Sequence, residues 1–204
     1  MVLAASLYLL GALASNSFGQ EPQPPINTTV GFTVSSYQIP SDRYQAVYGS
    51  GARIIYGLNL SRTILTTGGF QLDLSLEGRT FSKSGVSTLD QTPAKLTMTP
   101  IALAGRFLYE TRYVIPFVGF GADWYPYKET SDLATTSGTA TGWHYQVGAY
   151  VVIPGLDFLR VKLYYKYTRA DATQNGIAVQ LGGNEYGIGL SFGFSVLNKA
   201  VISF

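Results

Sequence analysis

The sequence predicts an all-β fold, an eight-stranded antiparallel up-and-down β-barrel that spans a membrane, and three observations support this prediction. Apolar and polar residues alternate with a period of two over most of the chain, the connections between these segments are alternately long and short, and aromatic residues gather near the segment ends. Because successive side chains of a strand point to opposite faces, the period of two indicates strands with one apolar and one polar face.

The alternation is clearest in residues 69–81, GFQLDLSLEGRTF. One face carries Phe70, Leu72, Leu74 and Leu76, and the other carries Gln71, Asp73, Ser75, Glu77 and Arg79. A helix would spread the leucines and the acidic residues around its whole circumference, so a helical interpretation fails. The same pattern recurs with no segment left to form a second layer, which favours a closed barrel over a sandwich.

Eight segments share this pattern, and we expect each to be one strand: 28–37, 52–60, 69–81, 95–110, 113–127, 142–154, 158–168 and 177–194. Long polar loops are expected at 39–50, 82–94, 128–141 and 169–176, with one helical turn in the first of them, capped by Ser41 and closed by Gly49. The remaining connections are short. Outer-membrane barrels have short periplasmic turns, long external loops and an even number of strands.

The aromatic residues provide an independent argument, because membrane barrels carry an aromatic girdle at each interface. One group falls near the loop ends of its strands (Trp124, Tyr127, Trp143, Tyr145, Tyr165, Tyr167) and another near the turn ends (Tyr109, Tyr113, Phe192, Phe194). The alternative is a soluble lipocalin-like barrel with its apolar face inside. That barrel would have to leave Arg160, Lys162 and Lys166 outside and enclose most of the Leu, Phe and Tyr.

Composition limits the other possibilities. The chain has 204 residues, which suits one domain, and its net charge of +2 is too small and too scattered to indicate nucleic acid as a partner. It has no cysteine and one histidine, so neither a disulfide framework nor a multi-histidine metal site is expected. After the amino terminus, no apolar run is long enough for a transmembrane helix.

Both ends of the chain are expected to lie outside the barrel. Residues 1–19 have the apolar run and small residues of a secretory signal peptide but no basic residue, so an upstream start or an uncleaved apolar anchor stays open. Residues 20–27 include a proline-rich stretch and read as a periplasmic linker. The barrel itself covers 28–194, and 195–204 either continues the last strand or forms a periplasmic tail.

The chain resembles the small eight-stranded outer-membrane barrels of Gram-negative bacteria, the class that contains the OmpA membrane domain, OmpX and OmpW. The resemblance covers residues 28–194 as a pattern of strands and loops. Its most specific part is the end of the last strand, Gly189 to Phe194, which looks like the carboxy-terminal β-signal of such proteins. The resemblance implies a porin-like outer-membrane protein that is assembled by the barrel-assembly machinery and is surrounded by lipid and lipopolysaccharide.

With the apolar face outside, the polar face fills the lumen. The charged residues expected there are Arg53, Asp73, Glu77, Arg79, Arg106, Glu110, Asp123, Arg160, Lys162, Lys166 and Glu185. An eight-stranded barrel is just wide enough for side chains to fill, and opposite charges crowded inside it should pair. We expect a salt-bridge network that plugs the barrel; the alternative is a narrow polar path for small solutes.

The sequence does not point to catalysis, a metal or a cofactor. Lipid-processing barrels rely on His with Ser and an acid, but here the only histidine, His144, has Gln146 where the His-x-Ser spacing needs serine. His144 is expected on the lumen side, as a rim histidine with satisfied hydrogen bonds. Asp42, Glu129 and Asp132 fall in expected loops without the spacing of a calcium site, so we expect solvated surface charges.

These expectations indicate a function without enzymatic activity. We expect a structural or surface-interaction component of the envelope, or a membrane anchor of a larger assembly, with protein partners contacting the four long loops. A narrow OmpW-like channel is the second possibility, and a lipid-modifying barrel enzyme is the third.

Overall fold

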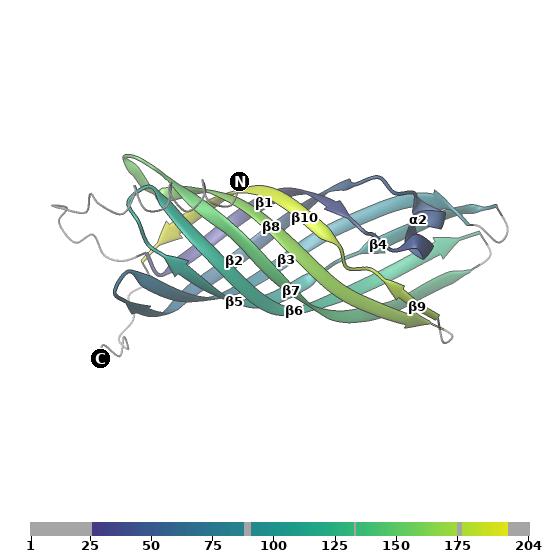
Figure 1. The fold of residues 1–204 in the computed structure, drawn as a ribbon. Helices are drawn as coiled ribbons and strands as arrows, with labels where there is room; N and C mark the ends of the chain where they lie inside the picture. The colour runs from purple at the N-terminus through teal and green to yellow at the C-terminus, as the bar shows by residue number, and fades with distance from the viewer. Residues whose placement is uncertain (1–25, 88–90, 133, 175–176, 196–204) are drawn as a thin grey trace, which may run out of the picture.

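The computed structural model describes residues 26–87, 91–132, 134–174 and 177–195, and these form one antiparallel sheet with one short helix (Figure 1). The expected signal peptide, most of the linker and residues 196–204 lie outside the described residues. The elements are β1 Thr28–Gln38, α2 Asp42–Tyr48, β2 Arg53–Thr67, β3 Phe70–Val86, β4 Pro93–Met98, β5 Ile101–Tyr109, β6 Val114–Ser131, β7 Thr135–Ile153, β8 Leu156–Gln174, β9 Ile177–Gln180 and β10 Asn184–Phe194.

The strands close into a ring of eight, as the alternation predicts. Both β4 and β5 lie between β3 and β6, and both β9 and β10 pair with β8, so each of these pairs occupies one place in the ring. Pro100 separates β4 from β5 because it has no amide hydrogen to give to the ladder. The Arg79 N–H still donates to the Pro100 carbonyl at 2.9 Å, which keeps both pieces in one wall.

Barrel closure is explicit in the register, because β10 pairs with β1 along its whole length. Starting at Thr28 and moving to the paired residue on each next strand leads once around the ring and back to β1 at Gln38, ten residues further along. The path runs through Arg62, Leu74, Gly105, Phe120, Tyr145, Tyr167 and Asn184. A stagger of this kind requires strands that are strongly tilted from the barrel axis, and Figure 1 shows the strands running obliquely across the barrel.

The expected orientation of the strands, with the apolar face outside and the polar face toward the lumen, is confirmed for their membrane-spanning part. Outward leucines such as Leu58, Leu74 and Leu163 are 65 %, 48 % and 47 % exposed, whereas Asp73 and Lys162 on the opposite face are buried. The described residues contain no helix long and apolar enough to cross a membrane.

Three of the four expected long loops are wrong in extent. β3 continues to Val86, β6 and β7 extend into the expected loop at 128–141, and β8 continues to Gln174. Only the first loop keeps its predicted form: α2 is followed by Gly49 as its C-terminal cap, and the φ of 75° there suits glycine. Ser41 precedes the helix as expected, but its side chain makes no capping hydrogen bond.

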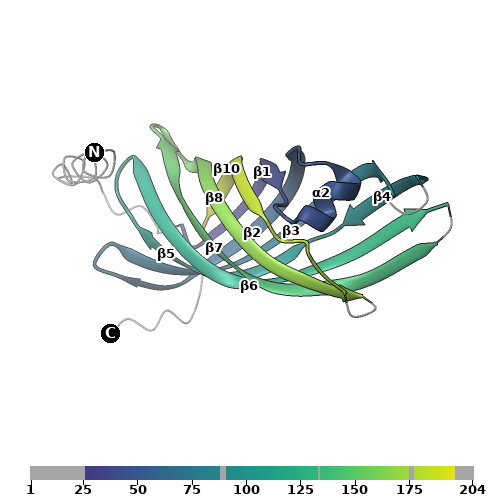
Figure 2. The same ribbon diagram turned by 45° about the vertical axis from the view of Figure 1, so that its right-hand side comes forward.

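These extensions escape a search for strands with apolar outer faces because the two faces exchange character along the strand. On β6, outward Phe120 and Trp124 are followed by outward Lys128, while inward Asp123 is followed by inward Tyr125 and then by Tyr127, which is half-buried. Where the outer surface meets lipid, an apolar outer face and a polar inner face are favoured. Where the outer surface meets water, a polar outer face and an aromatic inner face are favoured. We call the part of the barrel beyond this exchange, on the side of α2, the barrel extension (Figure 2).

Candidate functional site

The middle of the lumen holds a network of buried ion pairs with equal numbers of acidic and basic residues. Glu77 joins two lysines, with 3.1 Å to Lys162 Nζ and 3.0 Å to Lys166 Nζ. Arg79 joins Asp123, at 3.0 Å, to Glu185 on the other side of its guanidinium group. Lys166 Nζ also lies 3.6 Å from Asp123 Oδ1, and Arg106 pairs with Asp73 at 3.3 Å.

Hydroxyl groups complete this network. Glu185 Oε1 accepts hydrogen bonds from Tyr164 Oη at 2.5 Å and Ser35 Oγ at 2.8 Å, and Arg106 Nη1 donates to Tyr150 Oη at 2.8 Å. Each charge is therefore held by an opposite charge and by fixed dipoles, which is how a buried ionic cluster becomes tolerable. This arrangement can hold the strands together and fill the lumen.

Two residues expected in this network lie elsewhere, and a third lies in the lumen without an ion pair. Arg53 has the sequence parity of the lumen face, but it is the first residue of β2 and is exposed at the rim. Glu110 lies just past the end of β5, is exposed, and accepts a hydrogen bond from Gln71 Nε2 at 2.7 Å. Arg160 is buried, but among the described side chains it makes no ion pair, and its Nε has no hydrogen-bond partner.

His144 is fully buried inside the barrel, where its Nδ1 contacts the Asp123 carboxylate. Its Nε2 has no hydrogen-bond partner among the described residues, so the expectation of a rim histidine with satisfied hydrogen bonds is wrong. Position 146 is glutamine and is also buried, so no serine takes the place that the His-x-Ser spacing requires. The imidazole faces the ion-pair network and not the lipid. Among the described residues, no group of His, Cys, Asp or Glu side chains is arranged to hold a metal ion.

Two apolar clusters close the lumen on either side of the ion pairs. The lower closure, near the short turns, is formed by Leu108, Ile115, Phe117, Tyr150 and Tyr164. The upper closure lies in the barrel extension and is larger. Its buried members are Tyr37, Ile39, Tyr44, Tyr48, Ile55, Phe81, Ala94, Leu96, Met98, Tyr125, Ala140, Ala170, Ala172 and Leu181.

Helix α2 is the lid of the upper closure. Tyr44 and Tyr48 are four residues apart, so they lie on one face of the helix and both point into the cluster. Gly85 of β3 permits this packing, since a Cβ there would lie 2.2 Å from the Val47 carbonyl oxygen. Lys83 Nζ fixes the end of the helix by donating to the carbonyl oxygens of Gly49 and Gly51 at 3.0 and 2.9 Å.

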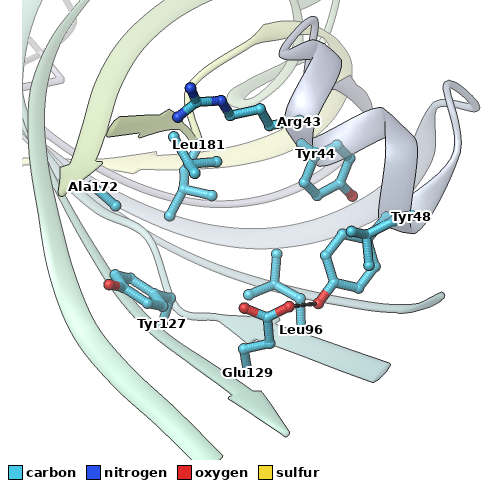
Figure 3. Close-up of a pocket in the computed structure, with 10 residues that line it drawn as sticks. Arg43, Tyr44, Tyr48, Leu96, Tyr127, Glu129, Ala172 and Leu181 are labelled. Atoms are coloured by element: carbon cyan, nitrogen blue, oxygen red, sulfur yellow. Dashed lines mark hydrogen bonds between the residues drawn. The ribbon is translucent and has the colours of Figure 1, made fainter. Parts of the chain in front are cut away.

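A hollow of about 160 Å³ remains between α2 and the strands of the extension (Figure 3). It is lined by Arg43, Tyr44, Val47, Tyr48, Leu96, Tyr127, Glu129, Ala172, Val179 and Leu181. Sequence reasoning missed this site and expected Glu129 as a solvated loop charge. The alternation of inward Tyr125, Tyr127 and Glu129 in β6 was the available signal.

The aromatic residues on the outer surface form two bands, and one expected member lies elsewhere. Outward rings pack in a row across neighbouring strands at the loop side, and the contacting pairs are Phe120–Trp143, Trp143–Tyr167, Tyr145–Tyr167, Tyr145–Tyr165 and Tyr165–Tyr186. Trp124 is also exposed there, and Tyr109, Tyr113, Phe192 and Phe194 are exposed at the turn side. Tyr127 is not in a girdle, because it points into the barrel and lines the hollow.

Comparison with known proteins decides the family. The model of the outer membrane protein beta-barrel domain family matches residues 4–194. The chain belongs to this family. Its place is therefore the bacterial outer membrane, where an apolar outer wall between two aromatic bands faces lipid. No curated protein matches the chain in sequence.

Solved outer-membrane barrels have the same fold. OprG from Pseudomonas aeruginosa is 11 % identical with a TM-score of 0.59, and the match covers 83 % of this chain and 97 % of OprG. Ail, the attachment invasion locus protein of Yersinia pestis, is 12 % identical with a TM-score of 0.51 over 82 % of this chain and 98 % of Ail. The N-terminal barrel domain of P. aeruginosa OprF is 13 % identical with a TM-score of 0.50 over 84 % and 100 %. At these identities the likeness establishes the fold alone.

Proposed function

We propose that this outer-membrane barrel does not conduct solutes and that it acts as a structural or surface-interaction component of the envelope. The observation that carries the proposal is the threefold closure of the interior. An apolar cluster lies below the ion pairs, and a second apolar cluster with α2 above it closes the mouth. A solute would have to displace packed side chains at both ends as well as separate buried ion pairs, and each of these steps is costly.

The barrel extension is the proposed interaction surface. Most of its outward side chains are polar, and its interior is packed apart from the hollow beneath α2, so it presents a shaped surface on paired strands instead of four long loops. Outward Lys95 and Lys128 lie on neighbouring strands of this surface. Their position beyond the aromatic band suits contact with lipopolysaccharide phosphates. We also propose that β10 is the segment read by the barrel-assembly machinery.

A narrow channel is the second candidate, because several buried polar atoms of the lumen have no hydrogen-bond partner among the described residues. They include both amide atoms of Asn59, both of Gln146 and the Ser191 hydroxyl. Such groups are normally hydrogen-bonded, and a hydrated path would satisfy them. A lipid-modifying activity is third, and the burial of His144 supports a barrel without enzymatic activity.

Planar-bilayer recording separates the first two candidates. The purified protein is expected to give no resolved single-channel steps. A variant with Ile115→Ala and Phe117→Ala removes two large side chains of the lower closure. It serves as the reference for what a loosened barrel gives in the same recording. Its folding is checked by the shift in gel mobility on heating. Stable, uniform steps from the unmodified protein would overturn the closed-barrel proposal and favour the channel.

A further inference from the structure

The hollow beneath α2 combines aromatic walls with one carboxylate. Tyr44 and Tyr48 enter it from the helix, and their ring centroids are 5.0 Å apart. Tyr127 faces them from β6, and Leu96 and Leu181 complete the apolar wall (Figure 3). Aromatic faces attract cations through the ring quadrupole. Tyr44 already does so within this protein, because Lys83 Nζ lies 5.5 Å from its ring centroid.

Glu129 supplies negative charge to this aromatic wall. Its side chain is half-buried, and its Oε1 accepts a hydrogen bond from Tyr48 Oη at 2.5 Å. Burial, together with this bond, raises the pKa of Tyr48 far above its usual value, so the phenol stays protonated and adds no charge. Within the described ranges, no Lys, Arg or His nitrogen lies close enough to form an ion pair with Glu129. The carboxylate therefore keeps a free oxygen and an uncompensated charge in a partly apolar site.

Arg43, the only cation in the lining described, does not neutralise Glu129. Its side chain is exposed, and its Nη1 donates to the Ala178 carbonyl oxygen at 3.0 Å, on the side of β9. Water screens a charge in that position far more than it screens a half-buried carboxylate. The lining thus has a solvated positive rim and a negative, aromatic interior.

We propose that this hollow binds a small organic cation. Its ammonium group would bind the Glu129 carboxylate and lie against the ring faces of Tyr127 and of the two helix tyrosines, and its apolar body would contact Leu96 and Leu181. The volume of about 160 Å³ suits one ring or a short branched chain, since an apolar cavity of about 150 Å³ holds benzene. This binding site does not depend on the proposed surface role or on whether the lumen conducts.

Three probes of the same size and different charge test the proposal by calorimetry on the detergent-solubilised barrel: phenethylamine, 2-phenylethanol and phenylacetate. Phenethylamine is expected to bind with one-to-one stoichiometry and the other two at least about tenfold more weakly, because a charge-assisted hydrogen bond contributes about 1.5–3 kcal/mol. Glu129→Gln is expected to weaken phenethylamine binding by about tenfold or more. Glu110→Gln makes the same chemical change at the opposite end of the barrel and should leave binding unchanged.

Tyr127→Leu provides a second test that keeps the carboxylate. It is expected to weaken phenethylamine binding several-fold and to leave the weak binding of 2-phenylethanol nearly unchanged, since only the cation loses an aromatic face. The heat-dependent gel shift confirms that each variant is folded. Failure of phenethylamine to bind, equal binding of the neutral probe, or unchanged binding by Glu129→Gln would each overturn the proposal.

Discussion

Replacement of Arg79 by methionine is expected to lower the free energy of unfolding by about 3–5 kcal/mol, the cost of leaving a buried charge without its partner. Arg79 is buried and pairs with both Asp123 and Glu185. Without it, Glu185 keeps only its bonds from Tyr164 and Ser35, and the lumen gains one net negative charge. Urea unfolding of the barrel in phospholipid vesicles, followed by the heat-dependent gel shift, measures the loss.

Two further variants isolate the cause. Lys95→Met removes an exposed cation of the extension and should change stability by no more than about 0.5 kcal/mol. Adding Glu185→Gln to Arg79→Met restores electrical balance and should recover part of the loss. If Arg79→Met were as stable as Lys95→Met, the ion-pair network would not hold the barrel together.

Leu163→Arg is expected to destabilise the barrel in the membrane by about 2–4 kcal/mol, the cost of an arginine on the lipid face near the bilayer midplane. Leu163 points outward from β8 and is 47 % exposed. It pairs with Ala149 on one side and Ile188 on the other, so its neighbours are apolar as well. Unfolding in vesicles of fixed lipid composition provides the measurement.

The matched control is Thr139→Arg. Thr139 also points outward and is exposed, but it lies on β7 beyond the aromatic band, next to Pro126 of β6. In water the new arginine should cost less than about 0.5 kcal/mol. Equal losses from the two arginines would mean that Leu163 does not face lipid.

The membrane-spanning wall could be predicted from the sequence because lipid imposes a simple rule on it. Every outward residue between the aromatic bands must be apolar or small, so Leu72, Leu74 and Leu76 reveal both the strand and its orientation. The lumen follows by parity, which explains why Asp73, Glu77 and Arg79 could be placed inside. The shift of ten residues along β1 after one circuit of the ring cannot be predicted from any single segment.

Prediction failed where the solvent changes. Beyond the aromatic band the outer face needs polar residues, so residues 128–141 resemble a loop although most of them are paired strand. Tyr127 lies at the loop end of the predicted strand, where a girdle residue is expected, but it shares the inward face of β6 with Asp123 and Tyr125. The prediction that Arg53 and Glu110 lie in the lumen is wrong because both residues lie at strand ends, where the alternation of faces no longer determines where a side chain points. The position of α2 depends on contacts with Gly85 and Lys83, which lie about forty residues away in sequence. A local sequence pattern does not encode contacts of this kind.

Solvent accessibility along β6 tests most directly whether the faces exchange character at the aromatic band. The chain has no cysteine, so single cysteines at 118, 120, 128 and 130 can carry a spin label without other changes. In vesicles, labels at 118 and 120 are expected to be accessible to dissolved oxygen and protected from a water-soluble nickel complex, and labels at 128 and 130 should show the reverse. Equal accessibility to the nickel complex at all four positions would contradict the account, because the apolar wall would then face water.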